Sequence, residues 1–145
     1  MHRKARRSAF TLVEVLIVVV ILAILAAAVV PQFSSSTQDA KFSTSVFNLQ
    51  TLRAQVQVFK AQHMGVYPDT LDKLVVATSK TGGAPSGNDS YGPYLLEVPE
   101  CPLVGSANVA AASSATPSVI AGGAGWAYHK DSGKIWINHA DYLTE

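Results

Sequence analysis

The pattern of apolar and polar positions divides the chain into an apolar run, a helical stripe and a loop-rich C-terminal part. From Phe10 to Val30 only Thr11 and Glu14 are polar, which gives a run of 21 residues. A helix needs about 20 apolar residues to span the hydrocarbon core of a bilayer. The first pattern therefore predicts a membrane-spanning helix segment over residues 10–30.

Beyond residue 40, apolar residues recur at steps of three and four, which is the spacing of one face of an α-helix. The stripe consists of Phe42, Val46, Leu49, Leu52, Val56 and Phe59. Gly65 and Pro68 predict the end of this helix, because Gly adopts positive φ easily and Pro cannot continue the hydrogen-bond ladder. We therefore expect one helix from Phe10 to about His63, with its second half packed on a sheet.

The C-terminal part predicts loops and one hairpin. Residues 69–74 are typical of a short capped helical turn, and residues 105–125 of a mobile surface loop. Residues 125–128 and 134–137 flank a turn in which Gly133 can take the left-handed conformation. Together these elements predict an α+β fold, in which a long N-terminal helix packs on a small antiparallel sheet.

Charge is distributed unevenly along the chain. Four basic residues precede the apolar run, namely Arg3, Lys4, Arg6 and Arg7. Basic flanks remain cytoplasmic, so the C-terminal part is expected outside the membrane. Without residues 1–9 the chain has seven Lys or Arg against ten Asp or Glu, which argues against a nucleic-acid surface. The predicted organisation is a basic leader over 1–9, a membrane helix segment over 10–30, and a head over 31–145 that includes the second half of the helix.

Glu14 lies inside the apolar run. A carboxylate near the centre of a membrane helix costs on the order of 3 kcal/mol, so an acid at this depth indicates a function. An ordinary signal peptide cut near Val29 and an uncleaved anchor are the alternatives. Glu14 and the length of the run both argue against the signal peptide.

The segment Ser8-Ala9-Phe10-Thr11-Leu12-Val13-Glu14 resembles the processing motif of type IV pilins and type II secretion pseudopilins. This resemblance implies cleavage between Ala9 and Phe10 by a prepilin peptidase, although Ala9 stands where the family usually has Gly. It implies N-methylation of Phe10 and pairing of Glu14 with the Phe10 amine of a neighbouring subunit. Such a pair would lower the cost of both buried ions.

A weaker resemblance covers the head. Residues 64–68 and the hairpin over 125–138 are similar to major pseudopilins of type II secretion systems. The resemblance implies a type IV pilin-like fold and a structural subunit of a pseudopilus, not an enzyme. A pilin of a surface type IV pilus, serving adhesion, motility or DNA uptake, and a membrane-anchored binding domain remain as alternatives.

The partners implied by this resemblance are further copies of the chain, prepilin peptidase, minor pseudopilins and an inner-membrane assembly platform. The implied location is the bacterial inner membrane with a periplasmic head, and then a filament. Pro31 sits where the family commonly has a helix-breaking proline. Both a simple kink and a helix that melts or stretches within a filament remain open at Pro31.

No cofactor is predicted. Calcium occurs in relatives of this group, but Asp131, Asp141 and Glu145 are too sparse to supply roughly six to eight oxygen ligands. His63, His129 and His139 lack the spacing of metal ligands. No Gly-x-Ser-x-Gly motif supports a nucleophilic serine.

Three aromatic residues and one cysteine complete the set of candidates. Trp126, Tyr128 and Trp136 are interpreted as cross-strand packing and not as a binding face. Cys101 is the only cysteine, and we expect an unreactive, partly buried thiol.

Overall fold

The computed structural model describes residues 10–143. The ordered elements are α1 (Leu12–Gln62), η1 (Leu71–Leu74), β1 (Val109–Ala111), β2 (Trp126–His129), β3 (Lys134–Ile137) and η2 (Ala140–Tyr142). The chain forms two compact units, Met1–Gln38 and Asp39–Glu145, and each is described by itself. The basic leader and Ala9 lie outside the described residues.

The first unit consists of the N-terminal part of α1. The segment Leu12–Val29 is long and apolar enough to cross a membrane, and none of it is buried within the subunit. The helix begins at Leu12, two residues after the predicted start at Phe10. It is continuous through Pro31 in the isolated chain, so a break or a melting transition at Pro31 stays a prediction for the filament.

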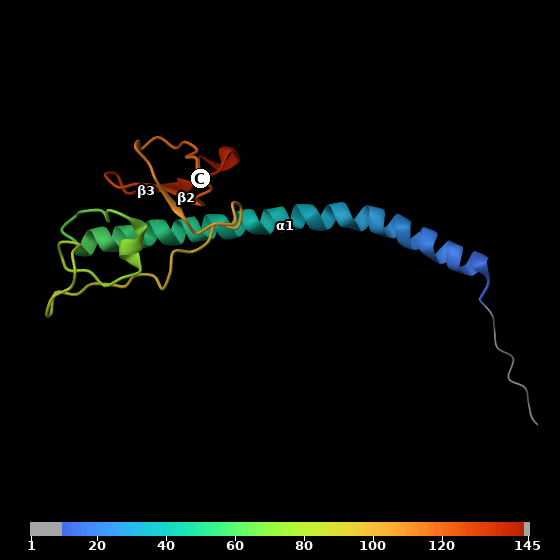
Figure 1. Cartoon of the computed structure of the whole chain (residues 1–145), viewed down its shortest axis with the longest axis horizontal. Coiled ribbons are helices and arrows are strands. Elements are labelled where there is room, and N and C mark those ends of the chain that lie inside the picture. The colour runs from blue at the N-terminus through green and yellow to red at the C-terminus, as the bar shows by residue number, and fades with distance from the viewer. Residues whose placement is uncertain (1–9, 144–145) are drawn as a thin grey trace, which may run out of the picture. The chain divides into compact units, whose positions relative to one another are not determined.

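The second unit has its core where the apolar stripe predicted. Leu49, Leu52, Val56 and Phe59 are buried, and Phe42 and Val46 are partly buried. This helix face packs against alternating residues of the hairpin, namely Trp126, Tyr128, Ile135 and Ile137. Figure 1 shows β2 and β3 lying along the second half of α1. The predicted α+β packing of a helix on a small sheet is confirmed.

The end of α1 also follows the prediction. Gly65 has a φ of +83°, and its N–H donates to the Lys60 carbonyl at 2.9 Å. Met64 precedes it with a φ of +56°. The left-handed conformation lets the last carbonyls of the helix find backbone donors, which terminates the helix. The short helical turn after it is present as η1, but Thr70 makes no side-chain capping hydrogen bond.

The sheet is mixed, so the prediction of a purely antiparallel sheet was wrong. The strand order is β1-β2-β3, with β2 and β3 antiparallel and β1 parallel to β2. β1 lies within 105–125, which was predicted to be loop throughout. Small residues without alternation give no strand signal, and β1 forms because β2 offers it an open edge. Its register pairs Val109 with Trp126 and Ala111 with Tyr128.

The two faces of the hairpin pack against different parts of the chain. Trp126 and Tyr128 face α1, whereas Trp136 and Ala127 lie on the opposite face. The indole N–H of Trp136 donates to the Ser118 carbonyl at 3.0 Å. All three aromatic side chains are buried, and each is paired across the strands with an aliphatic residue. Packing, and not an exposed binding face, therefore explains these aromatics.

Asn138, directly after β3, holds the loop over residues 120–124 in place through three hydrogen bonds. Its amide accepts from the Ile120 N–H at 2.7 Å and donates to the Ile120 and Ala124 carbonyls at 2.8 and 3.0 Å. The hairpin turn contains Gly133 with a φ of +67°, as predicted. The Asn138 contacts replace the backbone pairing that an irregular segment lacks.

Candidate functional site

The candidate processing and assembly site begins with a hydrogen-bonded box at the start of α1. Thr11 precedes the first helical residue, and Glu14 is the third residue of the helix. The Thr11 N–H and Oγ1–H both donate to Glu14 Oε2 at 2.9 Å, and the Glu14 N–H donates to Thr11 Oγ1 at 3.2 Å. This is a capping box, in which a Thr and a Glu three residues apart satisfy each other's backbone donors.

The capping box uses only part of the hydrogen-bonding capacity of the Glu14 carboxylate. Both Thr11 donors meet the same carboxylate oxygen, Oε2. An ionised carboxylate offers about four acceptor positions, so Glu14 retains capacity for a further donor. In the isolated subunit this side chain is exposed, which leaves it accessible to a group on another molecule.

Phe10 lies immediately before this box. Its side chain is 83% exposed, and it precedes the first turn of α1. The helix begins at Leu12 with Thr11 as its N-cap, so Phe10 lies two residues before the first helical residue. The pairing of Glu14 with the Phe10 amine of a neighbouring subunit stays a prediction.

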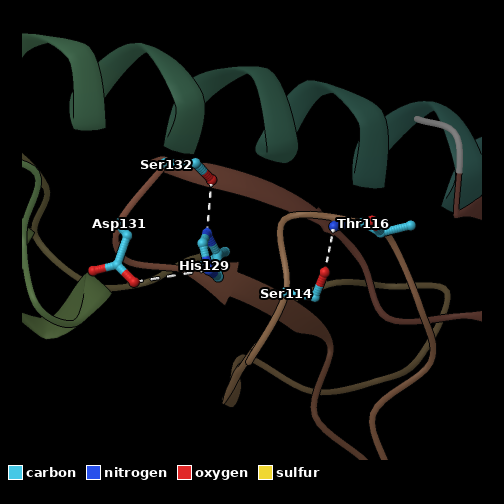
Figure 2. A network of polar contacts seen from close by, with 5 residues as sticks. All are labelled: Ser114, Thr116, His129, Asp131 and Ser132. Atoms are coloured by element: carbon cyan, nitrogen blue, oxygen red, sulfur yellow. Dashed lines mark hydrogen bonds and ion pairs between the residues drawn. The ribbon is translucent and has the colours of Figure 1, made fainter.

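A Ser, a His and an Asp meet in the turn between β2 and β3. Figure 2 shows the imidazole of His129 between Ser132 and Asp131. The Ser132 hydroxyl lies 2.8 Å from His129 Nδ1, but the nearest Asp131 oxygen lies 3.9 Å from Nε2. A distance of 3.9 Å is too long for a hydrogen bond, so Asp131 does not orient the ring as a catalytic triad requires. The three residues form a local turn.

The remaining histidines have structural contacts. His63 is buried, with Nδ1 2.7 Å from the Phe59 carbonyl and Nε2 2.9 Å from Thr78 Oγ1. Since a carbonyl only accepts, Nδ1 donates to Phe59, and the Thr78 hydroxyl pairs with the other ring nitrogen. His139 accepts from the Asp141 N–H at 3.3 Å, at the start of η2. Among residues 10–143, no group of three or more His, Cys, Asp or Glu could hold a metal ion.

A cavity of about 280 Å³ lies between η1 and β2. Tyr128 lines it, and its hydroxyl donates to the Pro68 carbonyl at 2.7 Å. Burial raises the pKa of Tyr128 above its ordinary value, and the nearby Tyr67, Asp69 and Asp131 raise it further. The hydroxyl is therefore held neutral as a hydrogen-bond donor, which is a structural role.

The sequence alone did not predict the capping box, the buried contacts of His63 or the contact between Cys101 and Ser45. The spacing of Thr11 and Glu14 before an apolar run is a readable capping signal. The buried contacts of His63 carry no such signal, because Thr78 is distant in sequence. Cys101 is fully buried and lies 3.5 Å from the Ser45 hydroxyl, a deeper position than the expected partial burial.

Comparison with known proteins covers both the N-terminal motif and the head. Residues 4–30 match the family described as the prokaryotic N-terminal methylation motif. Type II secretion system core protein G of Pseudomonas aeruginosa is 35% identical over 101 residues, which cover 69% of this chain and 70% of that protein.

Proteins of the same name give similar values in two other organisms. The one from Aeromonas hydrophila is 34% identical over 102 residues, covering 69% of this chain and 70% of its own length. The one from Vibrio cholerae is 31% identical over 102 residues, covering 70% of this chain and 69% of its own length. No solved structure gives a significant match.

Proposed function

Since the chain belongs to the type II secretion system core protein G family, we propose that Ala9, Phe10 and Glu14 are its processing and assembly site. The chain is a structural subunit of the pseudopilus, the filament of a type II secretion system. Its function is assembly and not catalysis, since its relatives are core components of a secretion system. This relation favours the pseudopilus over a surface type IV pilus.

The proposed processing step is cleavage between Ala9 and Phe10, followed by methylation of the Phe10 amine. The match to the methylation motif over residues 4–30 supports this position. Phe10 is exposed and not helical, so the new N-terminus would extend from the helix where an enzyme can reach it. Cleavage would also remove the four basic residues of the leader.

The proposed assembly contact joins Glu14 to the Phe10 amine of a neighbouring subunit. The observation that carries it is the capping box, which orients the Glu14 carboxylate and leaves acceptor positions open. In lipid an ionised carboxylate is costly, and an ammonium group from another subunit would offset that cost. Each added subunit would therefore neutralise one Glu14 carboxylate that is costly in the membrane.

The proposed topology follows from the basic leader. Four positive charges would hold the N-terminus in the cytoplasm, and the head would then lie in the periplasm. The family implies assembly into a filament and processing by prepilin peptidase. We propose minor pseudopilins and an inner-membrane assembly platform as further partners.

The test of processing is the intact mass and N-terminal sequence of protein extracted from the native membrane. We expect a start at Phe10 with one added methyl group of about 14 Da on the α-amine. A start near Val29 or at Met1 would contradict the proposed site. Ala9→Gly is the matched variant, and it should be cleaved at the same bond.

The test of assembly is Glu14→Leu in the full chain. We expect normal insertion and a folded head but loss of filaments, because the apolar side chain cannot pair with the amine. Val13→Leu changes the neighbouring apolar residue and should assemble normally. Filaments of Glu14→Leu in wild-type yield would show that Glu14 is not the assembly contact.

A further inference from the structure

The outer edge of β1, the edge that faces away from β2, is open. On the inner edge the Ala112 N–H donates to the Tyr128 carbonyl at 2.8 Å, and the Asn108 carbonyl accepts from β2 at 3.2 Å. Backbone groups alternate in direction along a strand, so Val109 and Ala111 direct their N–H and C=O groups to the outer edge. Within residues 10–143, no hydrogen bond reaches any of these outward groups.

The opposite edge of the sheet, along β3, is closed by the chain itself. The Arg53 guanidinium donates to the Ile135 carbonyl at 2.9 and 3.2 Å, and the His139 N–H donates to the Ile137 carbonyl at 2.9 Å. Proteins commonly protect a free strand edge in this way, or with charges and prolines, because an open edge can pair with another chain. β1 contains only Val and Ala, so neither a charge nor a proline protects its outer edge.

A cavity beside β1 provides a place for a side chain of the pairing strand. β1 has only three residues, and pairing of that length needs a side-chain contact to be stable. The cavity of about 280 Å³ is lined by Val109 and Ala111, the two residues of the open edge, together with Leu71 and Tyr128. Sites for small molecules usually measure about 300–1,000 Å³, so this cavity suits one long side chain.

The charges at the cavity favour a cationic side chain. Three exposed carboxylates line it, those of Asp69, Asp72 and Asp131, against the single ammonium group of Lys130. Within the described residues, neither Asp69 nor Asp72 forms an ion pair, and Asp131 is 3.9 Å from His129. Lys and Arg have an apolar stem and a charged end, which match an apolar wall and a carboxylate rim.

We propose that the outer edge of β1 and this cavity are a docking site for an extended segment of another protein. The segment pairs as a strand with the backbone of Val109 and Ala111 and places one Lys or Arg side chain beside the three carboxylates. Residues 10–145 carry seven Lys or Arg against ten Asp or Glu, so a basic partner is favoured over a second copy. The site does not involve Phe10 or Glu14, so it goes beyond the proposed function and does not depend on it.

The test is amide hydrogen exchange of the full chain in detergent, measured by nuclear magnetic resonance with and without a capped Thr-Val-Arg-Val-Thr peptide. We expect exchange at Val109 and Ala111 to slow roughly fivefold at a peptide concentration about four times its dissociation constant. Ala112 is the internal control, because its N–H already donates to Tyr128. Thr-Val-Glu-Val-Thr and a backbone N-methylated form of the first peptide should give no protection, since they lack the cation or the strand donors.

A pair of double variants tests the carboxylates. Asp69→Asn with Asp72→Asn should weaken binding of the arginine peptide roughly tenfold, because two charges leave the cavity. Glu97→Gln with Glu100→Gln removes the same charge from exposed positions outside the cavity and should bind like the wild type.

Four results would overturn the inference. They are no protection by the arginine peptide, equal protection by the glutamate peptide, protection of amides elsewhere than β1, and equal weakening by the two double variants. Slower exchange at Val109 and Ala111 when only the concentration of this chain is raised would identify a second copy as the occupant, and would overturn the choice of partner.

Discussion

The two parts of α1 have the same secondary structure but different sources of stability. In Leu12–Val29 no residue is buried within the subunit, although nearly all are apolar. In the second part, Leu49, Leu52 and Val56 are completely buried against the hairpin. The first part therefore depends on lipid or on other copies, whereas the second depends on contacts that the chain makes with itself.

This comparison predicts that equivalent substitutions have unequal effects. Leu52→Ala should reduce the free energy of unfolding of the head by about 2–5 kcal/mol, because it opens a cavity in a closely packed core. Leu22→Ala, in the membrane segment, should leave the head unchanged. Both tryptophans lie in the hairpin, so tryptophan fluorescence of the full-length protein in detergent reports on the head.

The comparison would fail if Leu22→Ala lowered the unfolding temperature of the head as much as Leu52→Ala. Such a result would mean that the two parts of α1 unfold as one cooperative unit. Circular dichroism of both variants should still show the helix, which confirms that each protein is folded before heating.

The second prediction concerns a contact between the hairpin turn and the segment after α1. A Cβ atom added at Gly133 would overlap the Tyr67 ring, and the φ of +67° is unfavourable for other residues. Gly133→Ala should therefore cost about 1–3 kcal/mol. Gly87 has a similar φ of +56° with nothing within 4 Å of an added Cβ. Gly87→Ala therefore measures the cost of the positive φ alone, without a steric overlap.

The two glycine variants are compared by chemical denaturation monitored by tryptophan fluorescence. Lys60, near the end of α1, donates to the Tyr67 hydroxyl at 3.1 Å, so displacement of this ring would also loosen the helix end. Equal destabilisation by both variants would mean that the Tyr67 overlap relaxes without cost.

The smallest expected effect is a loss of head stability at alkaline pH. Burial raises the pKa of Tyr128 above that of an unfolded tyrosine, so above pH of about 10 the unfolded chain loses a proton that the folded head keeps. The free energy of unfolding then falls as the pH rises, by at most about 1.4 kcal/mol per pH unit. The membrane segment contains no tyrosine and should show no such change.

Tyr128→Phe is the matched variant for the alkaline effect. It should be less stable at neutral pH by about 1 kcal/mol, because the hydrogen bond to the Pro68 carbonyl is lost. Its unfolding temperature should decline less between pH 9 and 11 than that of the wild type, over roughly the range where tyrosine ionises. Parallel curves for the two proteins would exclude Tyr128 as the cause.

Features that depend on neighbouring residues could be predicted from the sequence. The stripe of α1, the left-handed Gly65 and the turn at Gly133 are all local patterns, and the structure contains each of them. The parallel pairing of β1 could not be predicted, because Val109–Ala111 has no strand signal of its own. It depends on an edge that another part of the chain supplies.

The same distinction applies to the candidate site. The position of Glu14 in an apolar run could be recognised directly, and the Thr11 spacing was equally readable. The partner of Glu14 lies on another molecule, so neither the sequence nor a single chain contains it. Ala9 lies outside the described residues, and the cleavage site stays a prediction.

The hydrogen bonds from Asn138 to the loop over residues 120–124 have a consequence for how the sequence of this protein can change in evolution. One amide holds both Ile120 and Ala124, and residues 113–117 contribute no side chain to the core. Mutations in that stretch can accumulate without unfolding the head. Lineages can therefore alter the chemistry of this surface while they inherit the scaffold beneath it unchanged.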